Sequence, residues 1–255
     1  MEQSETETNE LRALMEMARV AQETGAAEDM EHLDGPAAAF NSIRIADLVS
    51  SYYRLENLRN PILDWGCGYG QVTWLLQRRG LPVVACDVQI RAARSLIPEL
   101  DRVPVDLCTD SIRLPYGPAS FGAVLSVGVL EHVADFDGSL AEVHRVLQPG
   151  GLFFIFMLPN RFSWAERIHE WRGISVHPYK FTFERISQML RTDRFTVEKR
   201  WRRNFLPRNL TGFSHKVKML YGRFYREIEV LDGLLANCPP TSLFSGVVEL
   251  IARKM

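Results

Sequence analysis

The sequence predicts an α/β fold with a doubly wound, mostly parallel sheet, and two stretches carry the prediction. Residues 61–71, PILDWGCGYGQ, form an apolar strand that leads directly into a glycine-punctuated turn and the start of a helix. Residues 151–160, GLFFIFMLPN, are a continuous apolar run of the kind that parallel sheets bury on both faces. Strands that alternate with helical segments in this way are typical of the doubly wound class.

The composition is that of an ordinary globular protein. Its 255 residues allow one α/β domain with insertions, and the formal net charge is -1. No apolar run reaches the roughly 18 residues of a membrane span, and the acidic start lacks the features of a signal peptide. We therefore expect a cytoplasmic protein. The four cysteines show no paired spacing, so we expect neither a disulfide framework nor a zinc site.

Residues 1–35 are expected to form an acidic, partly disordered segment that contains one helix. The first ten residues are too polar to pack, whereas from Leu11 onward apolar side chains recur at helical spacing. This helix either covers the core or closes over a ligand, and the sequence leaves both open. Residues 36–255 then form the main domain, within which 159–240 include insertions on the substrate side.

The glycine turn points to a specific class of ligand. Gly66, Gly68 and Gly70 let the backbone pass close to a ligand where a Cβ atom would clash. The spacing D-x-G-x-G-x-G differs from the dinucleotide fingerprint, Asp64 would repel a pyrophosphate, and no Gly-Lys-Ser/Thr of a phosphate loop follows. An acid with glycines suits a ligand that has an ammonium group and a ribose but no phosphate. S-adenosylmethionine (SAM) has these properties.

Five segments in order resemble the class I SAM-dependent methyltransferases: ILDWGCGYG, VVACDV, DSIRLPYGPASF, VLSVGVLEHV and RVLQPGGLFFIFMLPN. The resemblance is to methyltransferase type 11 domains and in part to ubiquinone-biosynthesis O-methyltransferases, and it runs from about residue 40 to 195. It implies a Rossmann-like sheet of seven strands, the last two antiparallel, with N-terminal helices. A helical insertion near 210–240 would precede the last strand, expected at 244–251, with one helix around 217–235.

Asp87 is the best candidate for a cofactor contact, because an acid at the end of a second strand grips ribose hydroxyls in nucleotide folds. The alternative is that it caps the next helix. The resemblance implies that Arg44 binds the SAM carboxylate, unless it faces solvent, that Asp110 receives the adenine amino group, and that the Val127 carbonyl receives the ammonium. The expected cofactor-binding residues are Arg44, Asp64, Gly66, Cys67, Gly68, Asp87, Val88, Asp110, Ser111 and Val127.

Two histidines are the candidate catalytic residues. His132 follows the fourth strand, and His177 lies in a segment that resembles the H-x-x-x-F motif of the ubiquinone-type enzymes. Either could act as general base at neutral pH, or be a structural histidine bonded to backbone. In those enzymes the acids and histidine of an E-x-x-E-H stretch hold a divalent metal. Here Gly128 replaces the first glutamate, so we expect no required metal.

The expected function is methyl transfer from SAM to a small-molecule or lipid-like acceptor, with O-methylation favoured. Residues 159–226 carry 16 Lys and Arg against five Asp and Glu, interspersed with aromatics. This mixture fits an anionic or amphiphilic acceptor or a membrane surface; nucleic acid ranks third, and a charge-balanced surface over buried aromatics is the plain alternative. A peripheral membrane contact and a homodimer are the other partners considered. The alternative function is binding of SAM or a partner without turnover.

Overall fold

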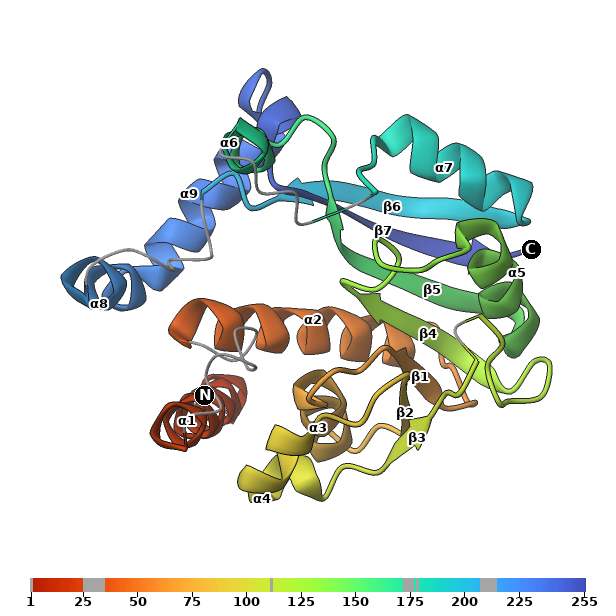
Figure 1. Ribbon diagram of the computed structural model, residues 1–255, viewed down its shortest axis with the longest axis horizontal. Coiled ribbons are helices and arrows are strands. Elements are labelled where there is room, and N and C mark those ends of the chain that lie inside the picture. The colour runs from red at the N-terminus through yellow and green to blue at the C-terminus, as the bar shows by residue number, and fades with distance from the viewer. Residues whose placement is uncertain (1, 25–34, 111, 172–176, 178, 207–214) are drawn as a thin grey trace. The chain divides into compact units, whose positions relative to one another are not determined.

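The computed structural model describes residues 2–24, 35–110, 112–171, 177, 179–206 and 215–255 (Figure 1). Its seven strands have the order β3-β2-β1-β4-β5-β7-β6, and most neighbouring pairs are parallel. The predicted seven-stranded, mostly parallel sheet is therefore confirmed. The chain divides into two compact units, Met1–Thr109 and Asp110–Met255.

The first unit contains three parallel strands and their helices. In chain order the elements are α1 (Glu2–Glu23), α2 (Gly35–Leu55), β1 (Ile62–Trp65), α3 (Gln71–Arg78), β2 (Val83–Asp87), the 3-10 helix η3 (Ala92–Leu96), α4 (Pro98–Asp101) and β3 (Val105–Leu107). Strand β2 lies between β1 and β3, and the register pairs Asp64 with Ala85. Parallel pairing brings the carboxyl ends of all three strands to one edge.

Glu10 on helix α1 is an exception to the expectation that the first ten residues do not pack. The helix begins at Glu2, and Glu10 is only 1% exposed. Its carboxylate accepts hydrogen bonds from Nε and Nη2 of Arg79, at 2.9 and 2.6 Å, and Arg79 also pairs with Asp47 at 2.8 Å. The partner lies 69 residues away, so local polarity could not reveal it. Helix α1 also packs on α2 and η3, which supports a covering role.

The second unit contains four strands. Its elements are β4 (Phe121–Val127), α5 (Phe136–Val146), β5 (Leu147–Pro159), α6 (Trp164–Trp171), α7 (Phe183–Thr192), β6 (Phe195–Arg203), α8 (His215–Arg223), α9 (Tyr225–Asn237), the 3-10 helix η4 (Thr241–Phe244) and β7 (Val247–Lys254). Strands β4 and β5 are parallel, whereas β7 runs antiparallel to both β5 and β6. The predicted antiparallel pair at the end of the chain is confirmed.

Two predicted boundaries near the insertion are wrong. The single helix expected around 217–235 is two helices, α8 and α9, because Phe224 leaves the helical conformation at φ -105° and ψ 25°. The last strand begins at Val247 and not at 244, because Thr241–Phe244 forms η4 after Pro239 and Pro240. Proline removes a backbone donor and interrupts regular elements, which explains why the strand begins three residues later than predicted.

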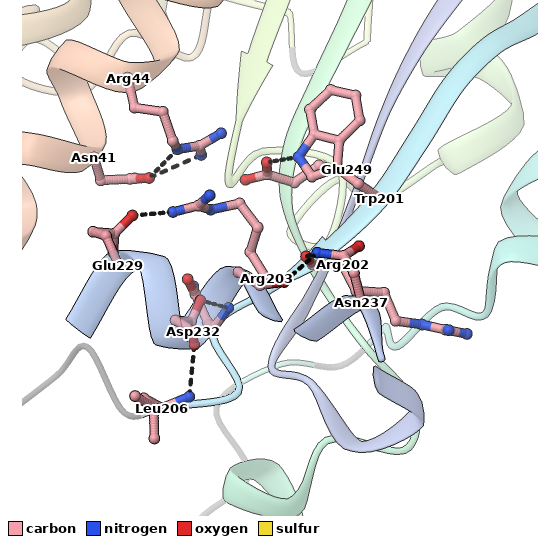
Figure 2. Close-up of polar contacts among 12 residues, drawn as sticks. Asn41, Arg44, Trp201, Arg202, Arg203, Leu206, Glu229, Asp232, Asn237 and Glu249 are labelled. Atoms are coloured by element: carbon pink, nitrogen blue, oxygen red, sulfur yellow. Dashed lines mark hydrogen bonds and ion pairs between the residues drawn. The ribbon is translucent and has the colours of Figure 1, made fainter. Parts of the chain in front are cut away.

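Helices cover both faces of β6. The guanidinium of Arg202 lies 4.6 Å from the centre of the Phe183 ring, on α7. The next residue, Arg203, pairs with Glu229 on α9 (Figure 2). Because successive side chains of a strand point to opposite faces, α7 and α9 lie on opposite sides of β6. This is the doubly wound arrangement that the sequence predicted.

The core of the second unit is centred on β5. Phe153, Phe154, Ile155 and Phe156 are all fully buried. This confirms that the apolar run belongs to a strand buried on both faces, with β4 on one side and β7 on the other. The candidate catalytic residues come after the carboxyl ends of β4 and β5 in the chain.

Candidate cofactor and catalytic sites

The glycine loop joins β1 to α3 and is tied to the end of β2. Gly68 has φ +59°, a conformation that side chains other than glycine rarely adopt. Its N–H donates to Oδ2 of Asp87 at 2.8 Å. A Cβ atom built on Gly68 would have nothing within 4 Å, so the loop leaves open space beside this backbone. That space fits the close approach of a ligand.

Asp87 is held in place at the carboxyl end of β2. Besides the bond from Gly68, its Oδ1 accepts the N–H of Gln89 at 3.2 Å. The helix η3 begins later, after Arg91, and has no side-chain cap, so Asp87 does not cap it. The neighbouring Val88 is 62% exposed, an apolar surface suited to a base. A fixed carboxylate next to an exposed apolar side chain fits a ribose with its adenine.

Asp64 has an internal partner that the sequence did not reveal. The side chain is 2% exposed and accepts a hydrogen bond from Oγ1 of Thr73 at 2.5 Å. Burial raises the pKa of Asp64 to about 6, against the opposing effect of the Thr73 bond. Thr73 lies on the buried face of α3, and its threonine hydroxyl carries no sequence signal for this role. Asp64 therefore joins the end of β1 to α3 under the loop.

A second residue that sequence reasoning missed is Arg94, which is only 5% exposed. Its Nε donates to the carbonyl of Tyr69 at 3.1 Å, and its Nη2 donates to the carbonyls of Leu100 and Val103 at 2.6 and 2.5 Å. The guanidinium thus fastens the glycine loop to the connection between β2 and β3. These three backbone bonds satisfy a buried cation that would otherwise be costly.

The remaining cofactor candidates of the first unit are Arg44, Gly66 and Cys67. Nη2 of Arg44 donates to Oδ1 of Asn41, one turn earlier on α2, at 2.9 Å (Figure 2). Gly66 N–H donates to the carbonyl of Cys86 at 2.8 Å, which continues the pairing of β1 with β2. Burial raises the pKa of the Cys67 thiol, so Cys67 contributes shape and backbone to the loop and not a reactive thiolate.

In the second unit, Asp110 and Val127 are the described cofactor candidates, whereas Ser111 lies outside the described residues. Asp110 is exposed, and its Oδ1 accepts the N–H groups of Arg113 and Ile112 at 2.9 and 2.8 Å. These backbone bonds lower the pKa of Asp110, so it is an anion at neutral pH. Val127 ends β4. How the candidates of the two units combine into one cofactor site stays a prediction.

The structure brings both candidate catalytic histidines together. The ring centres of His132 and His177 are 5.7 Å apart, and one nitrogen of each lies within 4.8 Å of a carboxylate oxygen of Glu131. Glu131 is 2% exposed, and its Oε2 has no hydrogen-bond partner among the residues that the structure describes. Burial raises the pKa of Glu131 to about 7. The unmet oxygen of this buried carboxyl is open to a donor from a ligand or an ordered water.

His177 has a second neighbour that the sequence analysis did not identify. Its Nδ1 lies 3.1 Å from Oε1 of Glu166, and Lys180 Nζ lies 3.4 Å from the other oxygen of that carboxylate. The His177 bond lowers the pKa of Glu166, with Lys180 adding to the effect. Glu166 is therefore an ionised partner of the candidate catalytic histidine.

The donor set limits the cations that the Glu131, His132 and His177 cluster could hold. Magnesium prefers six oxygen ligands, and the cluster offers one carboxylate with two imidazoles. Imidazole suits zinc and other transition metals better. The expectation that the reaction requires no metal stays a prediction.

Known proteins share both the sequence pattern and the fold. A family model described as "Methyltransferase domain" matches residues 63–155. A ubiquinone biosynthesis O-methyltransferase of Methylocella silvestris is 34% identical over 182 residues, which cover 57% of this chain and 70% of that protein. This relative is similar to the chain over most of its own length.

Two solved structures agree at the level of the fold. A SAM-dependent methyltransferase of Thermotoga maritima matches with a TM-score of 0.59 and 15% identity, over 93% of this chain and 99% of that one. The 1,6-didemethyltoxoflavin-N1-methyltransferase of Burkholderia thailandensis, solved with S-adenosylhomocysteine, has a TM-score of 0.56 and 19% identity, over 94% and 90%. The Methylocella relative and the methyltransferase family model, together with this fold, show that the chain belongs to the class I SAM-dependent methyltransferases, and its cofactor is S-adenosylmethionine.

Proposed function

We propose that this methyltransferase acts on a hydroxyl group of a small, anionic or amphiphilic acceptor. The observation that carries the proposal is the cluster of Glu131, His132 and His177 beyond the end of β4. A hydroxyl must lose its proton to become a good nucleophile, whereas a neutral amine attacks without prior deprotonation. A group of proton acceptors is therefore of most use to an O-methyltransferase. The relative in Methylocella silvestris is an O-methyltransferase, which supports the same reaction.

The chain's residues would divide the work as follows. The bound cofactor supplies an electrophilic methyl group on a sulfonium. Asp87 holds the ribose hydroxyls, Asp110 receives the adenine amino group, and Arg44 binds the carboxylate. His132 or His177 takes the proton of the acceptor. Holding the two reactants in line is worth about 7–11 kcal/mol at best, so positioning supplies much of the rate.

Exposed aromatic side chains support an amphiphilic acceptor. Trp171 is 86% exposed, and Phe162 and Tyr179 are 37% and 39% exposed. They flank His177 in sequence, on the same segment that carries the excess of basic residues. Aromatic and basic side chains together suit a ligand with an apolar part and an anionic group. The peripheral membrane contact and the homodimer stay predictions. None of the helices in the described part of the chain has the length and apolarity that crossing a bilayer requires.

A matched set of acceptors tests the proposal. Release of S-adenosylhomocysteine would be measured with catechol, 3,4-dihydroxybenzoate, 4-octylcatechol and the amine analogue 4-octylaniline. We expect turnover with the phenols, faster with the carboxylate or alkyl chain, and none with the aniline. Methylation of the aniline alone would overturn the hydroxyl assignment. SAM binding without turnover on these phenols, or on metabolite and lipid fractions, would favour the non-catalytic alternative.

Ionic strength separates the anionic acceptor from the neutral one. With the anionic dihydroxybenzoate as acceptor, the Michaelis constant should rise severalfold between low and high salt, because exposed charges are screened beyond about 8–10 Å at physiological ionic strength. The Michaelis constant for neutral catechol serves as the control and should change little. If both constants respond alike, the basic excess after residue 159 is merely a solvated surface.

A further inference from the structure

We propose that Glu166 is the positioning residue of the proton acceptor: it fixes His177 in the tautomer whose Nε2 can take the proton of the acceptor hydroxyl. The inference rests on the proposed function and adds to it a residue with a defined task. Its basis is a sheltered carboxylate–imidazole pair within the second unit, formed by α6 and the segment that precedes α7.

The tautomer follows from the partners. Oε1 of Glu166 lies 3.1 Å from Nδ1 of His177. An ionised carboxylate can only accept hydrogen bonds, so the Nδ1 atom must carry the proton and donate it. In a neutral imidazole the proton is then absent from Nε2, which keeps its lone pair. The lowered pKa of Glu166, caused first by the His177 bond, agrees with an ionised carboxylate at neutral pH.

The pair is sheltered and held from several directions. The side chains of Glu166, His177 and Lys180 are 14%, 24% and 14% exposed. Lys180 approaches the second oxygen of Glu166 at 3.4 Å. Just beyond it, Phe181 N–H donates to the carbonyl of Pro159 at 2.8 Å, and Arg161 N–H donates to the Phe181 carbonyl at 2.9 Å. The segment that carries His177 is thus fastened to the end of β5.

At the start of α6, the side chain of Glu166 does not take part in capping the helix. Ser163 lies directly before the helix, and its Oγ accepts the N–H of Glu166 at 3.3 Å. In a capping box the glutamate side chain would return the bond to the serine N–H. Here Ser163 N–H donates to the carbonyl of Asn160 at 3.0 Å. The carboxylate of Glu166 is therefore available to His177 and Lys180.

The other surroundings of His177 are those of a reacting centre. His132 lies with its ring centre 5.7 Å away, and the buried Glu131 carries an oxygen without a partner in the described structure. In the proposed step the acceptor O–H bond breaks, its proton binds to Nε2, and the oxygen bonds to the methyl carbon as the carbon–sulfur bond breaks. The sulfur keeps the electron pair of that bond. The Glu166 carboxylate then stabilises the imidazolium that forms.

A purely structural ion pair is the competing explanation, and Glu170 provides the matched control. Glu170 lies on the same helix, one turn after Glu166, and also pairs with Lys180, but the described structure shows no contact with His177. Glu166→Gln and Glu170→Gln each remove one carboxylate from this network. Only the first removes the acceptor of the Nδ1 proton. An amide can offer either its carbonyl or its NH2 group, so glutamine no longer selects one tautomer.

The first measurement is spectroscopic and does not depend on the acceptor. Nitrogen-15 shifts of His177, assigned with His177→Gln, report which ring nitrogen carries the proton. We expect the Nδ1–H form in the wild type and in Glu170→Gln, and a mixture of tautomers in Glu166→Gln. A mixture already present in the wild type, or no change in Glu166→Gln, would overturn the inference.

The second measurement is kinetic, with the phenol that the wild type methylates fastest. Glu166→Gln should lower kcat by about 10²-fold, in the range of general base catalysis, while the KM for SAM stays within about twofold. Glu166→Asp keeps the carboxylate and should recover part of kcat, and Glu170→Gln should resemble the wild type. Full turnover by Glu166→Gln would overturn the inference alone, whereas a wild type that methylates no phenol would overturn the proposed function.

Discussion

The two units treat the buried carboxylates of their candidate sites in opposite ways. In the first unit, Asp64 bonds to Thr73, and both oxygens of Asp87 accept backbone N–H groups. In the second unit, Glu131 is equally buried but has an oxygen without a partner in the described structure. The chain itself satisfies Asp64 and Asp87, as it does Asp232 and Glu249 away from the second site, whereas Oε2 of Glu131 has no partner in the described structure.

This difference separates positioning from chemistry. Acids that already hold backbone in place can present a preformed surface to a cofactor at little cost of reorganisation. A buried acid with an unmet oxygen is costly until a donor arrives, and such groups are typical of places where a ligand or a proton is handled. We expect substitutions in the first unit to change SAM affinity and substitutions around Glu131 to change turnover.

The largest effect should come from the histidines. His177→Ala should lower kcat by about 10²–10⁴-fold, the usual contribution of a general base, and leave SAM affinity within about twofold. His132→Ala, measured beside it, shows whether the neighbouring ring shares the task. Steady-state kinetics measures kcat, and calorimetry measures the affinity for SAM. If both variants keep full turnover, proximity alone carries the reaction, and the contrast between the units is lost.

Glu131→Gln should change the pH dependence of stability. The pKa of Glu131 is raised from 4.5 to about 7 in the folded protein, so between these values the folded state holds a proton that the unfolded state has lost. Below a pH of about 4.5 the Glu131 carboxyl therefore does not lower the free energy of unfolding. As the pH rises from there to about 7, the free energy of unfolding of the wild type falls. The full loss is on the order of 3 kcal/mol.

Urea unfolding at several pH values tests this prediction. The stability of Glu131→Gln relative to the wild type should rise by that amount between pH of about 4.5 and 7.5, because glutamine does not titrate. Glu227→Gln, at an exposed position of α9, is the control and should show no such trend. A constant difference between Glu131→Gln and wild type would mean that Glu131 has a partner in solution.

Asp87→Ala should weaken SAM binding by about 10–100-fold, because buried hydroxyls would lose a charged partner and Gly68 would lose its anchor. Isothermal calorimetry measures the affinity, and wild-type binding is expected in the micromolar range, about 8 kcal/mol. Asp106→Ala, an exposed acid on the neighbouring strand, should bind SAM normally. Unchanged affinity in Asp87→Ala would contradict the ribose assignment.

The smallest effect is expected from chelation. Activity should survive EDTA and 1,10-phenanthroline, because magnesium finds too few oxygens here and Nδ1 of His177 already faces Glu166. Initial rates before and after dialysis provide the measurement. A rate that disappears and returns with magnesium or zinc would show that Glu131, His132 and His177 bind an ion. That result would also remove His177 from the role of base.

The sequence predicts those features whose cause is local. Gly68 and Asp87 belong to patterns with fixed spacing, and nearly all of the predicted apolar run at 151–160 lies within β5. The break at Phe224 was missed because the apolar stripe of the insertion continues across it. The packing of Glu10 was missed for a different reason, since its partner Arg79 is distant in sequence.

The missed site residues share one property: each acts through a contact that only the fold creates. Thr73 and Arg94 are buried. Thr73 donates a hydrogen bond to Asp64, and Arg94 donates one to the carbonyl of Tyr69 in the glycine loop. Glu166 stands three residues after Ser163, a spacing that reads as a helix cap. The motifs of the sequence predict the groups that are expected to touch ligands, whereas the groups that support them carry no motif.

The buried pair of Glu10 and Arg79 has a consequence for the order of assembly. During synthesis Glu10 leaves the ribosome 69 residues before its partner, and closing a loop of that length costs about 3–4 kcal/mol plus a constant. Helix α1 therefore cannot complete its docking until α3 has formed. Pulsed hydrogen exchange during refolding should show α3 amides protected before those of α1, and the reverse order would contradict this. Helix α1 is synthesised first but is then among the last parts of its unit to reach the native structure.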